Sequence, residues 1–530
     1  YVLQADQMFT AGGKPKLEVL TIGRSIHPHF MEIQIGSSPS TLRVWRTPNF
    51  SDFQKVNINS EIEWSDIAGD GKLYIRVTVK GSPDYISLAY IKLNYPQTID
   101  AASATEKYFT LVSDAADKSF IELQNVPAGA RLYDVTDATS VTAVGYTSGN
   151  PAQAVVTGTG SARKLFLASS FYTPAISRVS FRPINPQLHN YIIISNKLLM
   201  KPALEYTDVV KAYAEYRASA QGGGYDTLLV DVDLLFNQFN YGEKSPVAIY
   251  NFMKFLCATH TPEYLFIIGK GLSVDYGYYR KPNAFPLYKD FVPTAGLPPS
   301  DMFFTAGLDG TTEEPAVPTG RLTATNPTHI AAYLNKVKEM EALPYNALWR
   351  KNIIHLSGGL SAGEPELFKQ FMRGFQDIAE GNYLGGKVSA IAKRSPDVQL
   401  INISKEVNKG LSLITFYGHS SPSTIDFDIG FVTDPVQGYN NPGKYPTLFM
   451  NGCNIGAFFI PYTLFGEDWI NAANKGAIGF IAHSSYGLQS LLRNYADLFY
   501  KVGYNDSTFI RRGLGDIQKE VARRFINTYG

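Results

Sequence analysis

A histidine and a cysteine each stand directly after an apolar run that ends in glycine. His419 follows "LITFYG", and Cys453, one of two cysteines among 530 residues, follows "TLFMNG". A thiolate is the nucleophile of cysteine enzymes, and a nearby imidazole supplies the base or the cation that lowers the thiol pKa. These residue types predict a cysteine–histidine dyad if the two runs are neighbouring strands. The alternative is a buried cysteine and a hydrogen-bonded histidine without chemistry.

Other polar residues near the two runs are weaker candidates. His483 ends the run in "FIAHSS", and Tyr486 follows shortly after, so both are candidates for the wall of a substrate pocket. Asp426 and Asp428 lie just past His419 and could orient it or contact substrate, although exposed loop carboxylates are the simpler interpretation.

The part of the chain that must position these residues, 189–530, alternates apolar strands with amphipathic helices. The candidate strands are 191–195, 226–232, 263–269, 352–358, 411–418, 446–452 and 476–485. Near-continuous apolar strands between helices predict an α/β fold with a mostly parallel sheet flanked by helices. Ligands of such sheets bind beyond the carboxyl ends of the strands, where His419 and Cys453 stand.

The front of the chain has a different pattern. Short runs such as "LYIRVTVKG" and "RKLFLASS" are rich in β-branched and aromatic residues and are separated by Gly, Pro, Asn and Ser. They predict two β-rich modules, residues 1–100 and 101–188, ahead of the α/β domain at 189–530. Three domains agree with the length, which is too great for a single core.

Composition excludes several classes of function. A net charge of +1 and the absence of basic runs argue against nucleic-acid binding. No apolar run reaches the ~18 residues of a membrane-spanning helix. The eight histidines show no metal-binding spacing, and "LDGTTEEP" is rich in oxygen ligands but lacks EF-hand spacing. Cys257, within "YNFMKFLCATH", is interpreted as core filler.

Several motifs in order carry a resemblance. "EYLFIIGKG", "PPSDMFFTAGLDGTTEEPAVPTGRL", "FYGHSS", "LFMNGCNIG" and "DWINAANKGAIGFIAHSS" together resemble the gingipain-like cysteine peptidases, whose fold is caspase-like. With the β-rich front, the chain is most similar to members of that family that act as sortases of type IX secretion. The match spans residues 190 to about 520.

The resemblance implies roles for individual residues. Cys453 would be the nucleophile and His419 the general base and acid, with an oxyanion hole made by the backbone N–H groups of Cys453 and Ser420. Ser420 stands where the family has glycine. The family orients its histidine with a Glu, for which Glu364 and Glu366 are candidates here; the alternative is that both favour a helix N-terminus.

The resemblance also implies a biological role. Relatives at the bacterial cell surface or outer membrane cleave the C-terminal signal domains of secreted cargo and join cargo to surface lipopolysaccharide. The implied partners are such cargo and other type IX secretion components. No cofactor is implied, although structural calcium occurs in the family. The first residues show no signal peptide, and the end at residue 530 leaves two expectations, a catalytic domain truncated at its C-terminus or a shorter relative. The alternative function is a catalytically degenerate surface protein that binds cargo or partners without cleavage.

Overall fold

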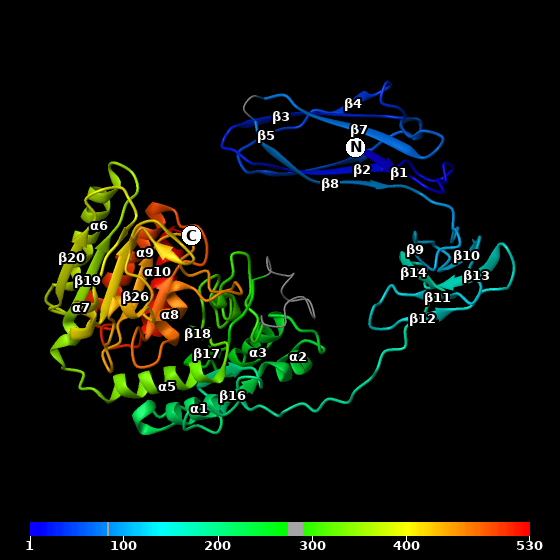
Figure 1. The fold of residues 1–530 in the computed structure, drawn as a ribbon. Coiled ribbons are helices and arrows are strands. Elements are labelled where there is room, and N and C mark those ends of the chain that lie inside the picture. Colours follow the sequence, from blue (N-terminus) through cyan, green and yellow to red (C-terminus); the bar gives the residue numbers. More distant parts are fainter. Residues whose placement is uncertain (82–83, 274–289, 530) are drawn as a thin grey trace. The chain divides into compact units, whose positions relative to one another are not determined.

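The chain forms two compact units, Tyr1–Ser177 and Arg178–Gly530 (Figure 1). The computed structural model describes residues 1–81, 84–273 and 290–529. Each unit has its own hydrophobic clusters, so each is described by itself. The domain borders predicted at residues 100 and 188 stay a prediction at that level of detail.

The first unit consists almost entirely of antiparallel strands. A sheet of order β1-β7-β3-β4, with β5 paired to β3, accompanies the sheet β6-β2-β8. Alternate residues of these strands are buried, as in β2, because one face packs on the core and the other meets solvent. The strands are β1 (Val2–Gln4), β2 (Lys16–Gly23), β3 (Pro28–Gly36), β4 (Arg43–Arg46), β5 (Asn49–Ser51), β6 (Lys55–Glu61), β7 (Lys72–Val79) and β8 (Ile86–Asn94).

A second group of strands in the same unit surrounds a separate hydrophobic cluster. The sheet β12-β11-β14-β9 accompanies the pair β10-β13. The strands are β9 (Glu106–Leu111), β10 (Lys118–Leu123), β11 (Arg131–Asp134), β12 (Thr142–Val144), β13 (Ala152–Thr157) and β14 (Arg163–Ala168). The β-rich character predicted for the front of the chain is thus confirmed.

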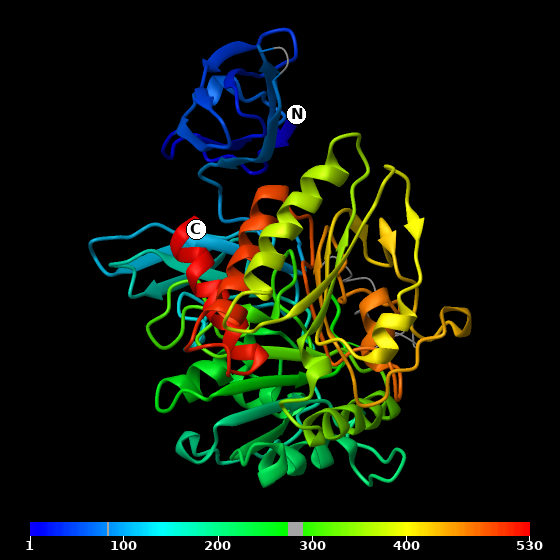
Figure 2. The ribbon, with the colours of Figure 1, turned by 90° about the vertical axis from the view of Figure 1, so that its left-hand side faces the viewer.

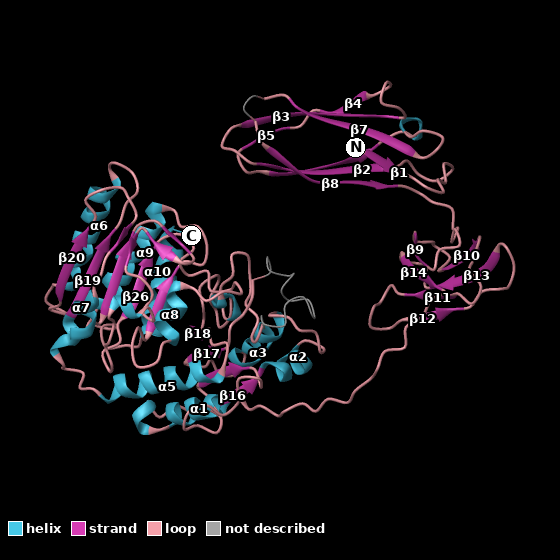
Figure 3. Ribbon diagram, viewed as in Figure 1, coloured by secondary structure: helices cyan, strands magenta, loops and turns pink. Residues whose placement is uncertain are grey.

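The second unit contains two parallel sheets, of order β16-β15-β17-β18 and β20-β19-β22-β26-β27 (Figure 3). The strands are β15 (Tyr191–Ser195), β16 (Thr227–Asp231), β17 (Tyr264–Ile268), β18 (Thr319–Leu322), β19 (Asn352–Ser357), β20 (Lys387–Ala392), β22 (Leu413–Tyr417), β26 (Thr447–Asn451) and β27 (Gly479–Ala482). The fold class predicted from the sequence is confirmed. Each predicted apolar run contains a strand, whereas β18 and β20 were not predicted.

Helices cover both sheets. The first sheet packs against α1 (Val209–Ala218), α2 (Val232–Phe239), α3 (Val247–Cys257) and α5 (Pro327–Ala342). One face of the second sheet packs against α6 (Glu364–Ala379), α9 (Gln489–Asn505) and α10 (Leu514–Tyr529), which lie side by side in Figure 2. Its other face packs against α7 (Ser404–Lys409) and α8 (Phe465–Asn471). None of the described helices is long and apolar enough to cross a membrane.

Candidate active site

The candidate site lies where two central strands of the second sheet end. β22 and β26 are parallel neighbours, with Tyr417 opposite Asn451. The N–H of Gly418 donates to the Asn451 carbonyl at 3.1 Å, which continues the ladder one residue further. His419 follows Gly418, two residues beyond the end of β22, and Cys453 stands two residues beyond Asn451, the last residue of β26. Both side chains therefore come from the same edge of the sheet, as the sequence predicted.

The two glycines before these residues allow close packing at that edge. A Cβ on Gly418 would lie 2.5 Å from a carboxylate oxygen of Asp426 and 2.6 Å from the Phe416 ring. A Cβ on Gly452 would lie 2.2 Å from the Ser420 hydroxyl. Any larger residue would displace these neighbours, which explains the glycine that precedes each functional residue.

Cys453 is half-buried and has defined polar neighbours. The N–H of Gly487 donates to its Sγ at 3.4 Å, and the hydroxyl of Ser420 donates to its carbonyl at 2.8 Å. The Sγ in turn donates to the Gly487 carbonyl at 3.6 Å, so both backbone groups of Gly487 contact the thiol. Among the described residues, no hydrogen bond joins Cys453 to His419. Sequence reasoning missed Gly487, which stands 34 positions further along the chain and belongs to no recognisable motif.

His419 is oriented by an acid from α6. Its Nε2 lies 3.0 Å from Oε2 of Glu364, and the two side chains are 44% and 23% exposed. Of the two candidate acids, Glu364 is thus the one brought to the imidazole. Glu366 is exposed and pairs instead with Lys369, whose Nζ lies 3.3 Å away.

The carboxylate of Glu364 also closes the turn before α6. It accepts the backbone N–H groups of Leu360 at 2.8 Å and Ser361 at 2.9 Å. Partial burial acts to raise the pKa of Glu364, but these two donors and His419 outweigh it and hold the pKa below its ordinary value. Glu364 is therefore a carboxylate at neutral pH, able to stabilise an imidazolium.

Ser420 replaces the family's glycine without backbone strain. It begins the short strand β23 (Ser420–Ser421), which pairs with β24 (Thr424–Ile425), so its backbone is extended. The N–H of Asp426 donates to the His419 carbonyl at 2.9 Å, which makes Ser420 and Ile425 a non-hydrogen-bonded pair. The N–H of Ser420 therefore points away from β24 and takes no part in the hydrogen bonds between β23 and β24.

Asp426 is not among the described residues that line the two cavities reported below, and it is buried, not an exposed loop carboxylate. It is 3% exposed, and its Oδ2 accepts the Gly359 N–H at 2.6 Å and lies 3.3 Å from the Lys393 ammonium. Through its bond to Gly359, the carboxylate thus stabilises the turn between β19 and Glu364. Asp428 is half-buried and bonds within its own loop.

A cavity of about 350 Å³ opens beside Cys453. Its lining comes from the segments that follow β26 and β27 and from two further loops: Ser273, 297–299, Pro422, Asn454, Ala457, Phe459, Ile460 and 484–486. Tyr486, predicted as a pocket wall, is part of this lining. We call this cavity the side-chain pocket.

His483, the other candidate for the pocket wall, is not among the described lining residues. Its carbonyl accepts the Gly456 N–H at 2.9 Å, and its ring packs edge-on against Tyr495. Burial lowers the pKa of His483, so the ring is neutral at physiological pH.

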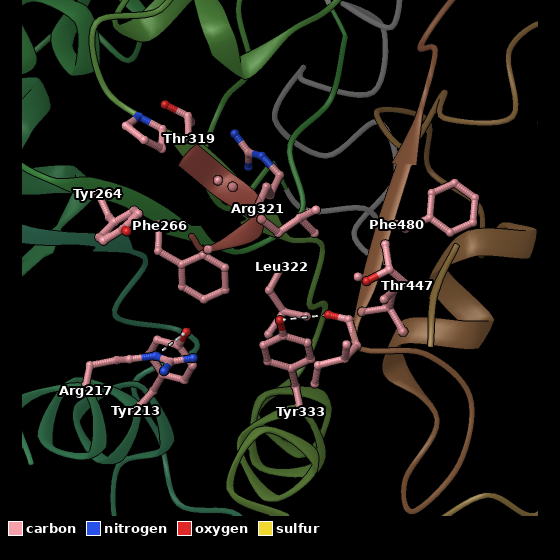
Figure 4. A pocket seen from close by; sticks show the side chains of 18 of the residues that line it. Tyr213, Arg217, Tyr264, Phe266, Thr319, Arg321, Leu322, Tyr333, Thr447 and Phe480 are labelled. Carbon is pink, nitrogen blue, oxygen red and sulfur yellow. Dashed lines mark hydrogen bonds between the residues drawn. The ribbon is translucent and has the colours of Figure 1, made fainter. Parts of the chain in front are cut away.

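A second cavity, of about 890 Å³, lies elsewhere, between β18 and β27 (Figure 4). It reaches Thr447, the first residue of β26, and so lies away from the carboxyl end that carries Cys453. Its polar side chains pair with one another: Arg217 donates to Glu341 at 2.9 Å and to the Tyr213 hydroxyl at 3.1 Å. This cavity holds no nucleophile beside a base among its described residues.

The described residues contain no group of three or more His, Cys, Asp or Glu side chains placed to hold a metal. Structural calcium therefore stays a prediction from the resemblance alone.

Parallel sheets with a histidine and a cysteine at adjacent strand ends define a cysteine-peptidase scaffold of caspase-like fold. A family model described as peptidase family C25 matches residues 184–529. The chain belongs to this family, whose members are cysteine peptidases. No curated protein matches the chain by sequence.

Several solved structures resemble this chain. Gingipain R (RgpB), an Arg-specific cysteine proteinase, is 17% identical, with 68% of this chain and 75% of that chain covered and a TM-score of 0.50. The complex of RgpB pro- and mature domains from Porphyromonas gingivalis is 15% identical, covering 64% and 74%, with a TM-score of 0.49. Latent dimeric PorU of the same organism is 12% identical, covering 64% of this chain but 35% of PorU, with a TM-score of 0.43.

Proposed function

We propose that this protein cleaves peptide bonds through Cys453 and His419, and that its substrates are secreted proteins with a C-terminal signal domain at the bacterial cell surface. The observation that carries the proposal is the contact of His419 with Glu364, 3.0 Å, at the sheet edge from which Cys453 also emerges. A histidine held by a carboxylate beside a cysteine is the arrangement that activates a thiol nucleophile.

The reaction is an acyl transfer in two halves. His419 takes the thiol proton, and the sulfur of Cys453 bonds to the peptide carbonyl carbon, whose oxygen becomes an oxyanion. The N–H groups of Cys453 and Ser420 would stabilise that charge. The carbon–nitrogen bond then breaks, and the leaving amine takes the proton from His419. The C-terminal product departs and a thioester remains on the enzyme.

The second half regenerates the enzyme. Water or an amine attacks the thioester and gives a proton to His419, which returns it to the sulfur as the thioester bond breaks. Water yields a free carboxyl terminus, whereas an amine yields a new amide. The amine route is the sortase reaction, for which an amine on surface lipopolysaccharide is the proposed acceptor.

The test uses a reporter cargo that carries a C-terminal signal domain. Wild-type protein should release that domain, and mass spectrometry should show a new C-terminus, or an adduct when an amine such as glycinamide is supplied. Cys453→Ala should abolish release, while Cys257→Ala should leave it unchanged. Binding of the reporter without release would favour the alternative, a family member that holds cargo without cleaving it.

A further inference from the structure

We propose, on the basis of the proposed function, that the side-chain pocket binds the residue on the acyl side of the cleaved bond and selects uncharged side chains. Two of the pocket's lining residues adjoin the residues that carry and contact the sulfur. Asn454, part of its lining, adjoins Cys453, and Tyr486 adjoins Gly487, whose N–H lies 3.4 Å from Sγ. The substrate side chain nearest to the pocket would be the one on the α-carbon next to the acyl carbon that the sulfur attacks.

Strand order determines which side of the substrate this pocket holds. The sheet runs β22-β26-β27, so Cys453 at the end of β26 stands between His419 on one side and residues 484–486 on the other. The leaving amine must lie near His419, because that imidazole supplies its proton. The acyl side then points toward β27, where residues 484–486 line the pocket.

The lining decides the preference. None of the described lining residues is Asp, Glu, Lys, Arg or His; they are apolar or carry a neutral hydroxyl or amide. The hydroxyl of Ser484 is already bonded to the Pro299 carbonyl at 2.7 Å. A cationic side chain in this pocket would lose water without gaining a counter-charge, which is unfavourable, whereas an apolar one would gain from burial.

One charged pair of the described residues lies behind Phe459 in the pocket wall, and its two charges neutralise each other. The Arg321 guanidinium lies 5.6 Å from the centre of the Phe459 ring. It is 4% exposed, and its Nε and one terminal nitrogen donate to Asp301 at 2.6 and 2.8 Å. This pair is therefore closed off from a substrate, and neither member offers a free charge to the pocket.

The volume sets the size of the ligand. About 350 Å³ is at the small end of the range for ligand pockets, which leaves room for one ordinary side chain. Leucine and alanine at the acyl position are thus matched in polarity and size, whereas arginine and lysine are mismatched in charge.

The test measures labelling of Cys453 by peptidyl acyloxymethyl ketones with Leu, Ala, Arg or Lys next to the ketone. The sulfur bonds to the methylene carbon and the carboxylate leaves, so each label is counted by mass spectrometry. We expect the Leu and Ala probes to react about tenfold faster or more than the Arg and Lys probes, as pocket discrimination allows. Arg or Lys probes that react as fast would overturn the selectivity.

A pair of variants makes the result independent of intrinsic thiol reactivity. Ser485→Asp places a carboxylate in the pocket and should raise the ratio of Arg to Leu labelling several-fold, while Ser485→Asn, of similar size without charge, should not. An unchanged ratio in Ser485→Asp would show that this cavity does not receive the side chain.

Iodoacetamide separates this proposal from the proposed function. If it labels Cys453 in a His419-dependent way while all four ketones fail, the pocket assignment is wrong and the dyad stands. If iodoacetamide labelling is indifferent to His419, the proposed function fails, and this inference fails with it.

Discussion

At the scale of single residues, the site depends on which acid reaches the imidazole. The sequence offered Glu364 and Glu366, two positions apart at the start of a helix. Residues two apart point roughly 200° away from each other around a helix, so one of them must face elsewhere. The sequence could not say which, because that choice depends on how α6 is rotated against the sheet.

Glu364→Gln should lower kcat/KM by at least roughly tenfold, because the amide cannot stabilise the imidazolium as a carboxylate does. KM should change little, since Glu364 contacts His419 and not the side-chain pocket. Kinetics on a peptide substrate would measure both quantities. Glu366→Gln is the matched control and should behave as the wild type; equal losses in both variants would contradict the assignment of Glu364.

The burial of Asp426 could not be predicted from its position in the sequence. Its neighbours in the sequence are those of a polar loop, but its partner Lys393 stands 33 positions away and both side chains are buried. Burial of a carboxylate with a distant ammonium leaves no local pattern, so the sequence favoured an exposed residue there and did not predict the buried ion pair.

At the scale of elements, apolar runs were sufficient to find the buried strands. β22 and β15 are buried at every position, and both were predicted. β20 was missed because it is an exposed edge strand, "KVSAIA", with little apolar signal. β18 was missed because "TGRL" contains a single large apolar residue. That β15 and β22 belong to different sheets could not be seen, since strand composition does not encode pairing.

The polar residue His355 inside buried β19 predicts a pH dependence of stability. Burial lowers the pKa of His355 to about 4, and the ring is 1% exposed. In the unfolded chain the pKa is about 6.5, so between these values the unfolded state binds the extra proton. The free energy of unfolding should therefore fall as the pH falls from 6.5 to 4, by about 1.4 kcal/mol per pH unit.

Urea denaturation at pH 7 and pH 5, followed by tryptophan fluorescence, measures this loss. His355→Gln should flatten the dependence relative to the wild type, because the titrating group is gone. His260→Gln, at an exposed position, should retain it. A slope that survives unchanged in His355→Gln would refute this cause.

Alanine substitution of two glycines separates tight packing at the end of β22 from the general effect of glycine on helix stability. Gly418→Ala forces a methyl group against Asp426 and Phe416 and should cost about 1–3 kcal/mol of stability. Gly374→Ala, in the middle of α6, meets no atom within 4 Å and should stabilise by about 0.5–1 kcal/mol. Chemical denaturation of the two variants gives both values, and effects of equal sign would contradict the packing argument.

At the scale of the whole molecule, the sequence pattern changes near residue 190, whereas the structure divides into compact units between Ser177 and Arg178. Alternating β-branched residues precede that change and alternating strands and helices follow it, and these two patterns are typical of different architectures. Residues 170–185, which cross the border, contain no helix or strand.

Trypsin should cut this connection after Arg178, which is exposed, while Arg182 precedes a proline and is protected. The expected early products are residues 1–178 and 179–530, identified by mass spectrometry. Arg178→Gln should remove this pair of fragments without changing the others. Persistence of the pair in that variant would show that another bond in the connection is more accessible.

The most direct test of the central claim, a thiol activated by His419, is the pH dependence of Cys453 alkylation by iodoacetamide. Cys257 is an internal control in the same molecule, because burial raises the pKa of its thiol. We predict that wild-type Cys453 reacts well below the free-thiol pKa of about 8.5, and that His419→Ala slows it to the rate of an ordinary thiol. A Cys453 that reacts only at alkaline pH, equally fast with and without His419, would contradict the account.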